Sequence, residues 1–215
     1  MKPTLLAIAR DFNEIGRDFH TRGWVLGTSG NFSVVVSRNP LGLAITASAV
    51  SKGAIRPADV LAIGAEGAPI GKRGGRPSAE TALHLAIART RTAGAVLHTH
   101  SIWSTVLSEM HGDEGGLRLS GFEMLKGLEG VRTHRHTEWL PIFENDQDMP
   151  ALASRVEAML QQSPAVHGFL LRGHGLYTWG DDLAQARRHV EILEFLLETS
   201  GRMEAARRHG PDQNS

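Results

Sequence analysis

Two histidines stand two residues apart in the segment GAVLHTHS, residues 94–101. In an extended strand, residues i and i+2 project from the same face, with Cα atoms about 6.6 Å apart. At that spacing His98 and His100 can bind one zinc ion, each through a nitrogen at roughly 2.0–2.1 Å. The alternative is an ordinary polar strand face, but the preceding Ala-Val-Leu indicates burial, and two buried imidazoles without partners would be costly. The segment therefore favours a metal site.

A third candidate ligand is His174, in the segment RGHGLYTWG. It follows the apolar stretch GFLL and stands between two glycines, which allow tight turns and a close approach of the backbone to a ligand. Alone, this motif also fits a histidine in a hairpin. Together with the H-x-H pair it gives three histidines and an open fourth position, which is typical of a catalytic zinc site. The chain has no cysteine, so only nitrogen and oxygen ligands are available.

Three turns rich in small and hydroxyl side chains predict a phosphate pocket. The segment GTSGNFS offers Asn31 and free backbone N–H groups, which can form an anion-binding nest. The segment TASAVSKG offers Ser48, Ser51 and Lys52, and RPSAE offers Ser78 at an expected helix start, where the helix dipole favours a phosphate. Each turn alone is common in proteins that bind nothing, so the prediction depends on all three.

Two carboxylates are candidates for acid and base chemistry. Glu80 lies in the helix before the H-x-H strand, and Glu123 lies in the mostly apolar segment SGFEMLKG. Either side chain could instead be a solvated helix residue. A glutamate beside zinc in a dry pocket can be tuned as a general acid or base.

The other histidines carry less weight. His134 and His136 repeat the i, i+2 spacing in RTHRHTEW, but they alternate with arginines, and a cation-rich strand is a poor site for another cation. We expect them to be exposed or interfacial. The remaining six are interpreted as surface or packing residues: His20, His84, His111, His167, His189 and His209.

Composition limits the classes of partner. Lys plus Arg number 23 and Asp plus Glu number 23, so no net field draws the protein to nucleic acid or to an anionic membrane. The N-terminal segment lacks the apolar stretch of a signal peptide, and no segment has the roughly 20 apolar residues of a membrane span. We expect a cytoplasmic protein that captures a small anionic substrate locally.

Helical and strand patterns interleave along the chain and predict a layered α/β domain over residues 1–208, with a flexible tail at 209–215. Ser78 is the expected N-cap of the second helix, and Asp181 or Asp182 that of the last. We expect strands at 31–37, 42–46, 59–64 and 165–172, a strand holding His98 and His100, and helices at 4–22, 78–91, 101–110, 120–128, 149–163 and 181–208.

Taken in order, GTSGNFS, PSAE, LHTHS and RGHGLYTWG resemble the class II aldolase and epimerase family of zinc enzymes over most of the chain. FEMLKG and LPIFENDQDMPALA are similar to its dehydratase branch. The resemblance implies a three-layer α/β/α domain with a mixed, largely antiparallel sheet. It also implies a homotetramer with the active site near a subunit interface.

For the site, the resemblance implies one Zn²⁺ per subunit on His98, His100 and His174. The substrate phosphate would lie against Gly30, Asn31, Ser48 and Ser78. Glu80 matches the acid/base residue of the aldolases, and Glu123 matches that of the dehydratases. The implied reaction is loss of water from a sugar phosphate through a metal-stabilised enediolate. An aldolase or 4-epimerase, and a non-enzymatic scaffold with structural zinc, stay open as alternatives.

Overall fold

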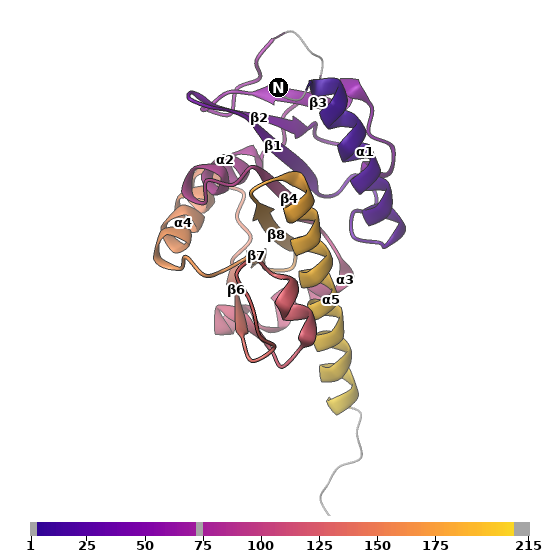
Figure 1. Cartoon of the computed structure of the whole chain (residues 1–215), viewed down its shortest axis with the longest axis vertical. Helices are drawn as coiled ribbons and strands as arrows, with labels where there is room; N and C mark the ends of the chain where they lie inside the picture. Colours follow the sequence, from indigo (N-terminus) through magenta and orange to yellow (C-terminus); the bar gives the residue numbers. More distant parts are fainter. Residues whose placement is uncertain (1–3, 72–74, 209–215) are drawn as a thin grey trace, which may run out of the picture.

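The computed structural model describes residues 4–71 and 75–208, and Figure 1 shows how its elements are arranged. The expected tail at 209–215 and part of the basic loop before Pro77 lie outside the described residues. The helices are α1 (Leu5–Thr21), α2 (Thr81–Thr90), α3 (Ile102–Met110), α4 (Met149–Gln162) and α5 (Leu183–Arg208). The strands are β1 (Asn31–Arg38), β2 (Leu41–Thr46), β3 (Val60–Ile63), β4 (Ala95–Thr99), β5 (Gly116–Ser120), β6 (Thr137–Phe143), β7 (Gly168–Leu171) and β8 (Gly175–Gly180).

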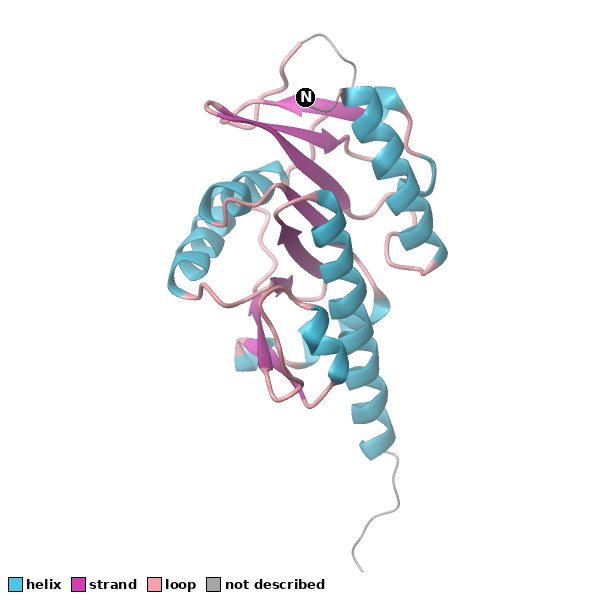
Figure 2. Ribbon diagram, in the orientation of Figure 1, coloured by secondary structure: helices cyan, strands magenta, loops and turns pink. Residues whose placement is uncertain are grey.

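The strands form one eight-stranded sheet in the order β3-β2-β1-β4-β8-β7-β6-β5. Only the β6–β7 pair is parallel, and every other paired strand runs antiparallel to its neighbour. In Figure 2 the helices lie on both sides of this twisted sheet. The expected three-layer α/β/α fold with a mixed, largely antiparallel sheet is confirmed.

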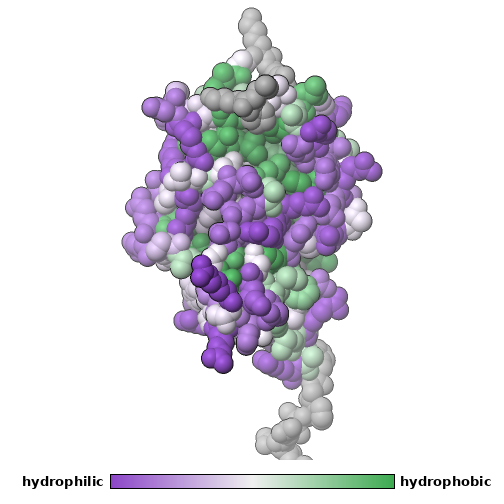
Figure 3. Space-filling view, viewed as in Figure 1, coloured by the Kyte–Doolittle hydropathy of each residue, from purple (hydrophilic) through white to green (hydrophobic). Residues whose placement is uncertain are grey.

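Apolar side chains fill both interfaces between sheet and helices. On one face, α2 and α4 pack through Leu83, Ile87, Leu152 and Val156 onto Phe169 and its neighbours. On the other face, α1 and α5 cover β1 and β4, and α3 joins α5 over β7 and β8. Figure 3 shows that polar side chains dominate the outer surface in the same view, apart from an apolar area at the end that carries β2 and β3.

The long periodic segments are confirmed. Helix α1 begins after Thr4, whose hydroxyl accepts the N–H of Ala7 at 3.2 Å, and it buries Phe12 and Phe19. The carboxylate of Asp182 accepts the N–H of Gln185 at 2.8 Å at the start of α5, as one of the two expected caps.

Two expectations about local structure are wrong. Ser78 does not cap α2, because its carbonyl closes a turn with the N–H of Thr81 at 3.1 Å and the helix begins three residues later than expected. The segment at 120–128 forms the short 3₁₀ helix η4 (Glu123–Gly127), because Gly121, with φ +81°, and the extended Leu128 confine it to about one turn.

The described residues contain no helix that is both long and apolar enough to span a bilayer.

Candidate metal and sugar-phosphate site

Three imidazoles converge at one edge of the sheet. His98 lies near the end of the buried strand β4, His100 follows that strand, and His174 lies in the turn between β7 and β8. The antiparallel pairing of Thr99 with Leu176 brings the two segments together. The three Nε2 atoms are 2.8 Å apart for His98 and His100, 3.1 Å for His100 and His174, and 3.3 Å for His98 and His174. The structure therefore brings the three predicted ligands to one point.

The other ring nitrogens of this group fix the tautomers. Nδ1 of His98 donates to the carbonyl of Leu176 at 2.9 Å, and Nδ1 of His174 lies 3.3 Å from the Oδ1 of Asn145. Because a donating Nδ1 leaves Nε2 with its lone pair, these rings direct lone pairs at one another. Carbonyl partners of this kind orient ligating histidines in metal sites, so the donor set fits a divalent metal.

Burial disfavours the charged form of two of the three imidazoles, His98 and His100. His98 is fully buried and stacks on Tyr177 with ring centroids 3.8 Å apart. Burial lowers the pKa of His98, and it lowers the pKa of His100 to about 3. Neutral imidazole is the form that binds a metal, so burial favours the ligating form of His98 and His100.

Glu80 completes the group from the start of α2. Its Oε1 lies 3.1 Å from Nε2 of His174 and 3.6 Å from Nε2 of His98. Burial opposes ionisation of Glu80, but the neighbouring His98 and His174 outweigh it and hold the pKa of this carboxyl well below its usual range. The four residues form a candidate metal group in which each ligand atom lies within 4.8 Å of the others.

A hydrogen-bonded chain orients Asn31 towards this carboxylate. The Ser33 hydroxyl lies 2.7 Å from Nδ1 of the buried His84, whose Nε2 contacts the Asn31 carbonyl oxygen. Asn31 then donates its amide N–H to Oε2 of Glu80. Since the carbonyl of Asn31 must accept, His84 carries its proton on Nε2. His84 is buried, which agrees with its expected packing role, but it also positions a predicted phosphate ligand, a role that only the fold reveals.

The three predicted phosphate turns meet beside the histidines. They line a pocket of about 220 Å³ that contains Gly30, Asn31, Ser48 and Ser78, with Glu80 and His100 at its inner end. The sequence-based expectation that these turns lie together therefore agrees with the lining of one pocket. Small side chains and hydroxyl groups dominate this pocket, so a compact polar group fits it better than a large apolar one.

Lys52 supplies positive charge to this pocket. Its side chain is 1% exposed, and Nζ donates to the carbonyl of Thr28 at 2.8 Å and to that of Val50 at 2.7 Å. Burial lowers the pKa of Lys52 to about 8, although the nearby Glu80 carboxylate opposes this shift. The ammonium thus joins two of the three turns and offers a local cation in a protein with no net charge.

Glu123 lies away from the histidine group. Strand β5 runs towards the edge of the sheet opposite the three histidines. Its first residue, Gly116, pairs with Pro141, and its last residue, Ser120, pairs with Thr137 at the start of β6. Glu123 follows the far end of β5, its side chain is 70% exposed, and Oε1 pairs with Nζ of Lys126 at 2.5 Å. Among the described residues, no recorded contact joins Glu123 to Glu80 or to the three histidines.

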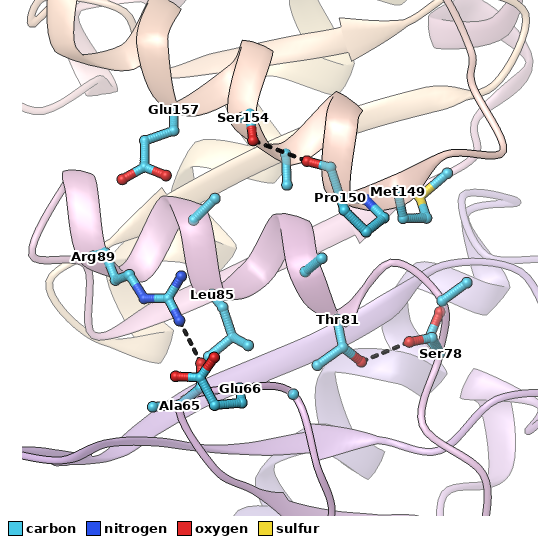
Figure 4. A pocket seen from close by; sticks show the side chains of 15 residues that line it. Ala65, Glu66, Ser78, Thr81, Leu85, Arg89, Met149, Pro150, Ser154 and Glu157 are labelled. Carbon is cyan, nitrogen blue, oxygen red and sulfur yellow. Dashed lines mark hydrogen bonds between the residues drawn. The ribbon is translucent and has the colours of Figure 1, made fainter.

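A larger pocket of about 390 Å³ between α2 and α4 is shown in Figure 4. Its polar side chains are largely held by main-chain carbonyls: Arg89 donates to Ala65, Thr81 to Ser78 at 2.7 Å, and Ser154 to Pro150 at 3.0 Å. Because the histidines do not line this pocket, we place the candidate site in the smaller one.

Comparison with known proteins agrees with this geometry. The family model described as class II aldolase and adducin N-terminal domain matches residues 10–200. The chain is 46% identical over 193 residues to the methylthioribulose-1-phosphate dehydratase of Sorangium cellulosum, covering 89% of this chain and 90% of that protein. It is 43% identical over 201 residues to the methylthioribulose-1-phosphate dehydratase of Methylococcus capsulatus, covering 93% and 96% respectively.

The fold is also shared with a solved enzyme. The crystal structure of L-fuculose-1-phosphate aldolase from Thermus thermophilus superposes with a TM-score of 0.74 at 23% identity, covering 96% of this chain and 100% of that one. At this identity the match supports the architecture alone, whereas the family model and the curated relatives span nearly the whole sequence. On these grounds the chain belongs to the class II aldolase and adducin family.

Proposed function

We propose that this protein dehydrates 5-methylthioribulose 1-phosphate to 2,3-diketo-5-methylthiopentyl 1-phosphate and water, as a lyase of methionine salvage. The single observation that carries the proposal is the convergence of three Nε2 atoms beside a polar pocket lined by the phosphate turns. The identity of 46% to a dehydratase of that name supports the choice of substrate.

His98, His100 and His174 would hold one Zn²⁺, and their unprotonated Nε2 atoms fit that role. A bound Zn²⁺ would act as a Lewis acid that polarises the C2 carbonyl and stabilises negative charge developing on the C2 and C3 oxygens. The residues around this position bind and orient the substrate. The phosphate binds in the 220 Å³ pocket, where Lys52 offsets its charge and Gly30, Asn31, Ser48 and Ser78 lie within reach as donors.

The reaction also needs groups that move protons. The C3 proton must leave, the C4 hydroxyl must depart with a proton as water, and the resulting enol must tautomerise to the diketone. We assign the acid and base role to Glu123. Glu80 is already bound to Asn31 and lies beside the histidines, so it holds the pocket and the metal position in shape.

Glu123 can reach this site only from a second copy of the chain, because its own strand β5 leads away from the histidine edge. An apolar pocket of about 530 Å³ adjoins Glu123 and contains Phe122, Met124 and Phe195. Met124 is 39% exposed and Phe195 is 47% exposed, so this face offers apolar surface for a neighbouring subunit. A cytoplasmic homotetramer with active sites near its interfaces is part of the proposal.

The decisive experiment is incubation of the zinc-loaded protein with 5-methylthioribulose 1-phosphate and detection of products by mass spectrometry. We expect a product lighter than the substrate by one water. Retro-aldol fragments without loss of water would assign the protein to the aldolases, and an inverted sugar would assign it to the epimerases. If zinc were only structural, its removal would unfold the chain, whereas we expect activity to disappear while the circular dichroism spectrum persists.

The placement of Glu123 is tested by complementation. Glu123→Gln should abolish dehydration with zinc content unchanged, and His100→Ala should abolish it through loss of the metal. Dissociating and reassembling a mixture of the two inactive variants should restore activity, because some interfaces then combine an intact metal site with an intact Glu123. No recovery in mixed assemblies, verified by differently tagged subunits, would show that Glu123 does not act between copies. Near-normal turnover by Glu123→Gln alone would transfer the role to Glu80.

A further inference from the structure

A second group of imidazole and carboxylate ligands lies at the opposite edge of the sheet from His98. His136 precedes β6, Glu138 lies near the start of β6, and His167 immediately precedes β7. The parallel pairing of β6 and β7 brings their starts together. One ligand atom from each of the three side chains lies within 4.8 Å of the others. This corrects the expectation that His134 and His136 lie in a cation-rich strand, because both precede β6 and a carboxylate faces the second.

The carboxylate of Glu138 is the buried centre of this group. Its side chain is 1% exposed, and Oε2 lies 2.8 Å from Nε2 of His136 and 2.9 Å from Nδ1 of His167. Its other oxygen accepts the backbone N–H of His167 at 2.9 Å. His136 is 28% exposed, so the group is open to solvent on that side. A buried carboxylate requires a positive charge close by, because leaving it unpaired away from water is costly.

The hydrogen bonds of His167 show which of its two ring nitrogens carries a proton. Nε2 of His167 lies 2.8 Å from the backbone carbonyl of Glu129, and a carbonyl can only accept, so Nε2 carries a proton. In neutral His167 the lone pair of Nδ1 then points at Oε2 of Glu138, and two acceptors face each other. Either a metal ion or a proton on Nδ1 removes this conflict. A backbone carbonyl on the far nitrogen is the partner that ligating histidines commonly have in metal sites.

We propose that His136, Glu138 and His167 form a second metal site, which binds Zn²⁺ or a similar divalent transition metal with water on the solvent side. Two imidazoles and one carboxylate are a ligand set that zinc accepts, with a fourth position left for water. The ligand atoms need to separate by only a few tenths of an ångström from their present spacing to surround an ion at roughly 2.0–2.2 Å.

The position of this site suggests what the metal does. It ties the start of β6 to the start of β7, and through Glu129 and His167 it fixes the segment that connects η4 to β6. That segment follows η4, whose first residue is Glu123, the residue with the proposed acid and base role. The site is separate from the histidine group at the other edge of the sheet, so its metal is structural or regulatory in character.

The competing occupant is a single proton. Burial disfavours the charged ring, but the hydrogen bond and charge of Glu138 outweigh it and raise the pKa of His167. A protonated His167 paired with Glu138 would satisfy both acceptors without a metal. The two occupants make different predictions for metal content, so the experiment can separate them.

The test is zinc content per chain, measured by elemental analysis after the full-length protein is saturated with Zn²⁺ and freed of loosely bound metal by gel filtration. We expect His136→Ala to contain one zinc fewer per chain than the unmodified protein. Glu138→Gln, which keeps the shape of the side chain, should lose the same equivalent and serves if His136→Ala folds poorly. His134→Ala is the matched control, because His134 is 56% exposed on the same connection and is not one of the three ligands.

Combination with His100→Ala separates this site from the proposed catalytic one. The single variant His100→Ala should keep one zinc per chain, bound at the second site. The double variant with His100→Ala and His136→Ala should keep none. The proposal is overturned if His136→Ala and Glu138→Gln, both folded by circular dichroism, contain as much zinc as His134→Ala. This second site rests on zinc content and not on dehydratase activity. If the dehydratase assay fails, we still expect His136→Ala and Glu138→Gln to contain one zinc fewer per chain, so the two proposals can fail independently.

Discussion

Gly30 provides a sharp test of how the phosphate turn and the metal strand depend on each other. Its backbone has φ +71°, and a Cβ atom added there would lie 2.5 Å from the carbonyl oxygen of His98. Gly27, in the same turn, has φ +63°, and an added Cβ would meet nothing within 4 Å. Gly30→Ala and Gly27→Ala therefore share the backbone strain, and only the first adds a collision with a metal-ligand residue.

The two effects differ in size. A left-handed conformation costs an L-residue about 1–2 kcal/mol, partly offset by the loss of glycine's freedom in the unfolded chain. We thus expect Gly27→Ala to lower the free energy of unfolding by about 1 kcal/mol, or the Tm by roughly 2–4 °C. Gly30→Ala must in addition separate β1 from β4 by at least 0.5 Å, since real Cβ contacts are essentially never shorter than 3.0 Å.

A shift of that size at the metal edge should reduce turnover by roughly 10- to 100-fold, because misplacement by about 1 Å can cost about 10²-fold. The assay is diketone formation from 5-methylthioribulose 1-phosphate, with zinc content and denaturant unfolding measured on the same samples. We expect Gly27→Ala to keep nearly full activity. Equal activity and equal stability of the two variants would refute the reasoning, because the collision with His98 would then have no consequence.

Three further predictions concern the buried groups. His98→Ala should lose the zinc equivalent of the histidine group together with turnover, and an active variant that lacks this equivalent would contradict the ligand assignment. Burial lowers the pKa of His84 from 6.5 to about 3, so between these values the unfolded chain binds the proton that the folded chain excludes. The free energy of unfolding should therefore fall by roughly 1.4 kcal/mol for each pH unit of acidification between pH 6.5 and about 3. In urea titrations at several pH values, His84→Gln should show a pH dependence that is smaller by the contribution of one proton. With the pKa of Lys52 lowered to about 8, kcat/KM should fall above that pH as its charge is lost, and Lys52→Arg, which stays charged, should lack this alkaline decline if it binds substrate.

The sequence predicts the elements whose pattern is long. Helix α1 and helix α5 extend over many turns, and β1 and β2 flank a clear turn, so tertiary context had little to override. The sequence pattern does not predict strands β5, β6 and β8. β5 begins with glycine, β6 contains a proline, and β8 begins and ends with glycine, and these residues weaken a strand pattern in isolation. These strands are defined by their neighbours in the sheet.

Features of the site that lie within one segment could be predicted from the sequence, whereas those that join distant segments could not. The H-x-H spacing of His98 and His100 is local, so the chemistry of the pair can be predicted from three consecutive residues at the end of β4. The link from Ser33 through His84 to Asn31 joins β1 to α2, and nothing in either segment alone marks it. The arginine neighbours of His136 argue against a metal site in the sequence, yet its partners Glu138 and His167 come close to it only when β6 and β7 pair.

Glu123 shows that a sequence motif can identify the type of a residue without locating it in the fold. The motif FEMLKG identifies a residue type suited to proton transfer, but the direction of β5 decides which metal site that residue can serve. Because β5 is antiparallel to β6, and β6 is parallel to β7, the end of β5 lies at the edge opposite His174. A sheet with β5 reversed would carry the same motif at the edge of the sheet that holds His174. The order and direction of strands thus determine which edge a motif residue occupies, and in this fold they make the proposed role of Glu123 depend on the proposed assembly.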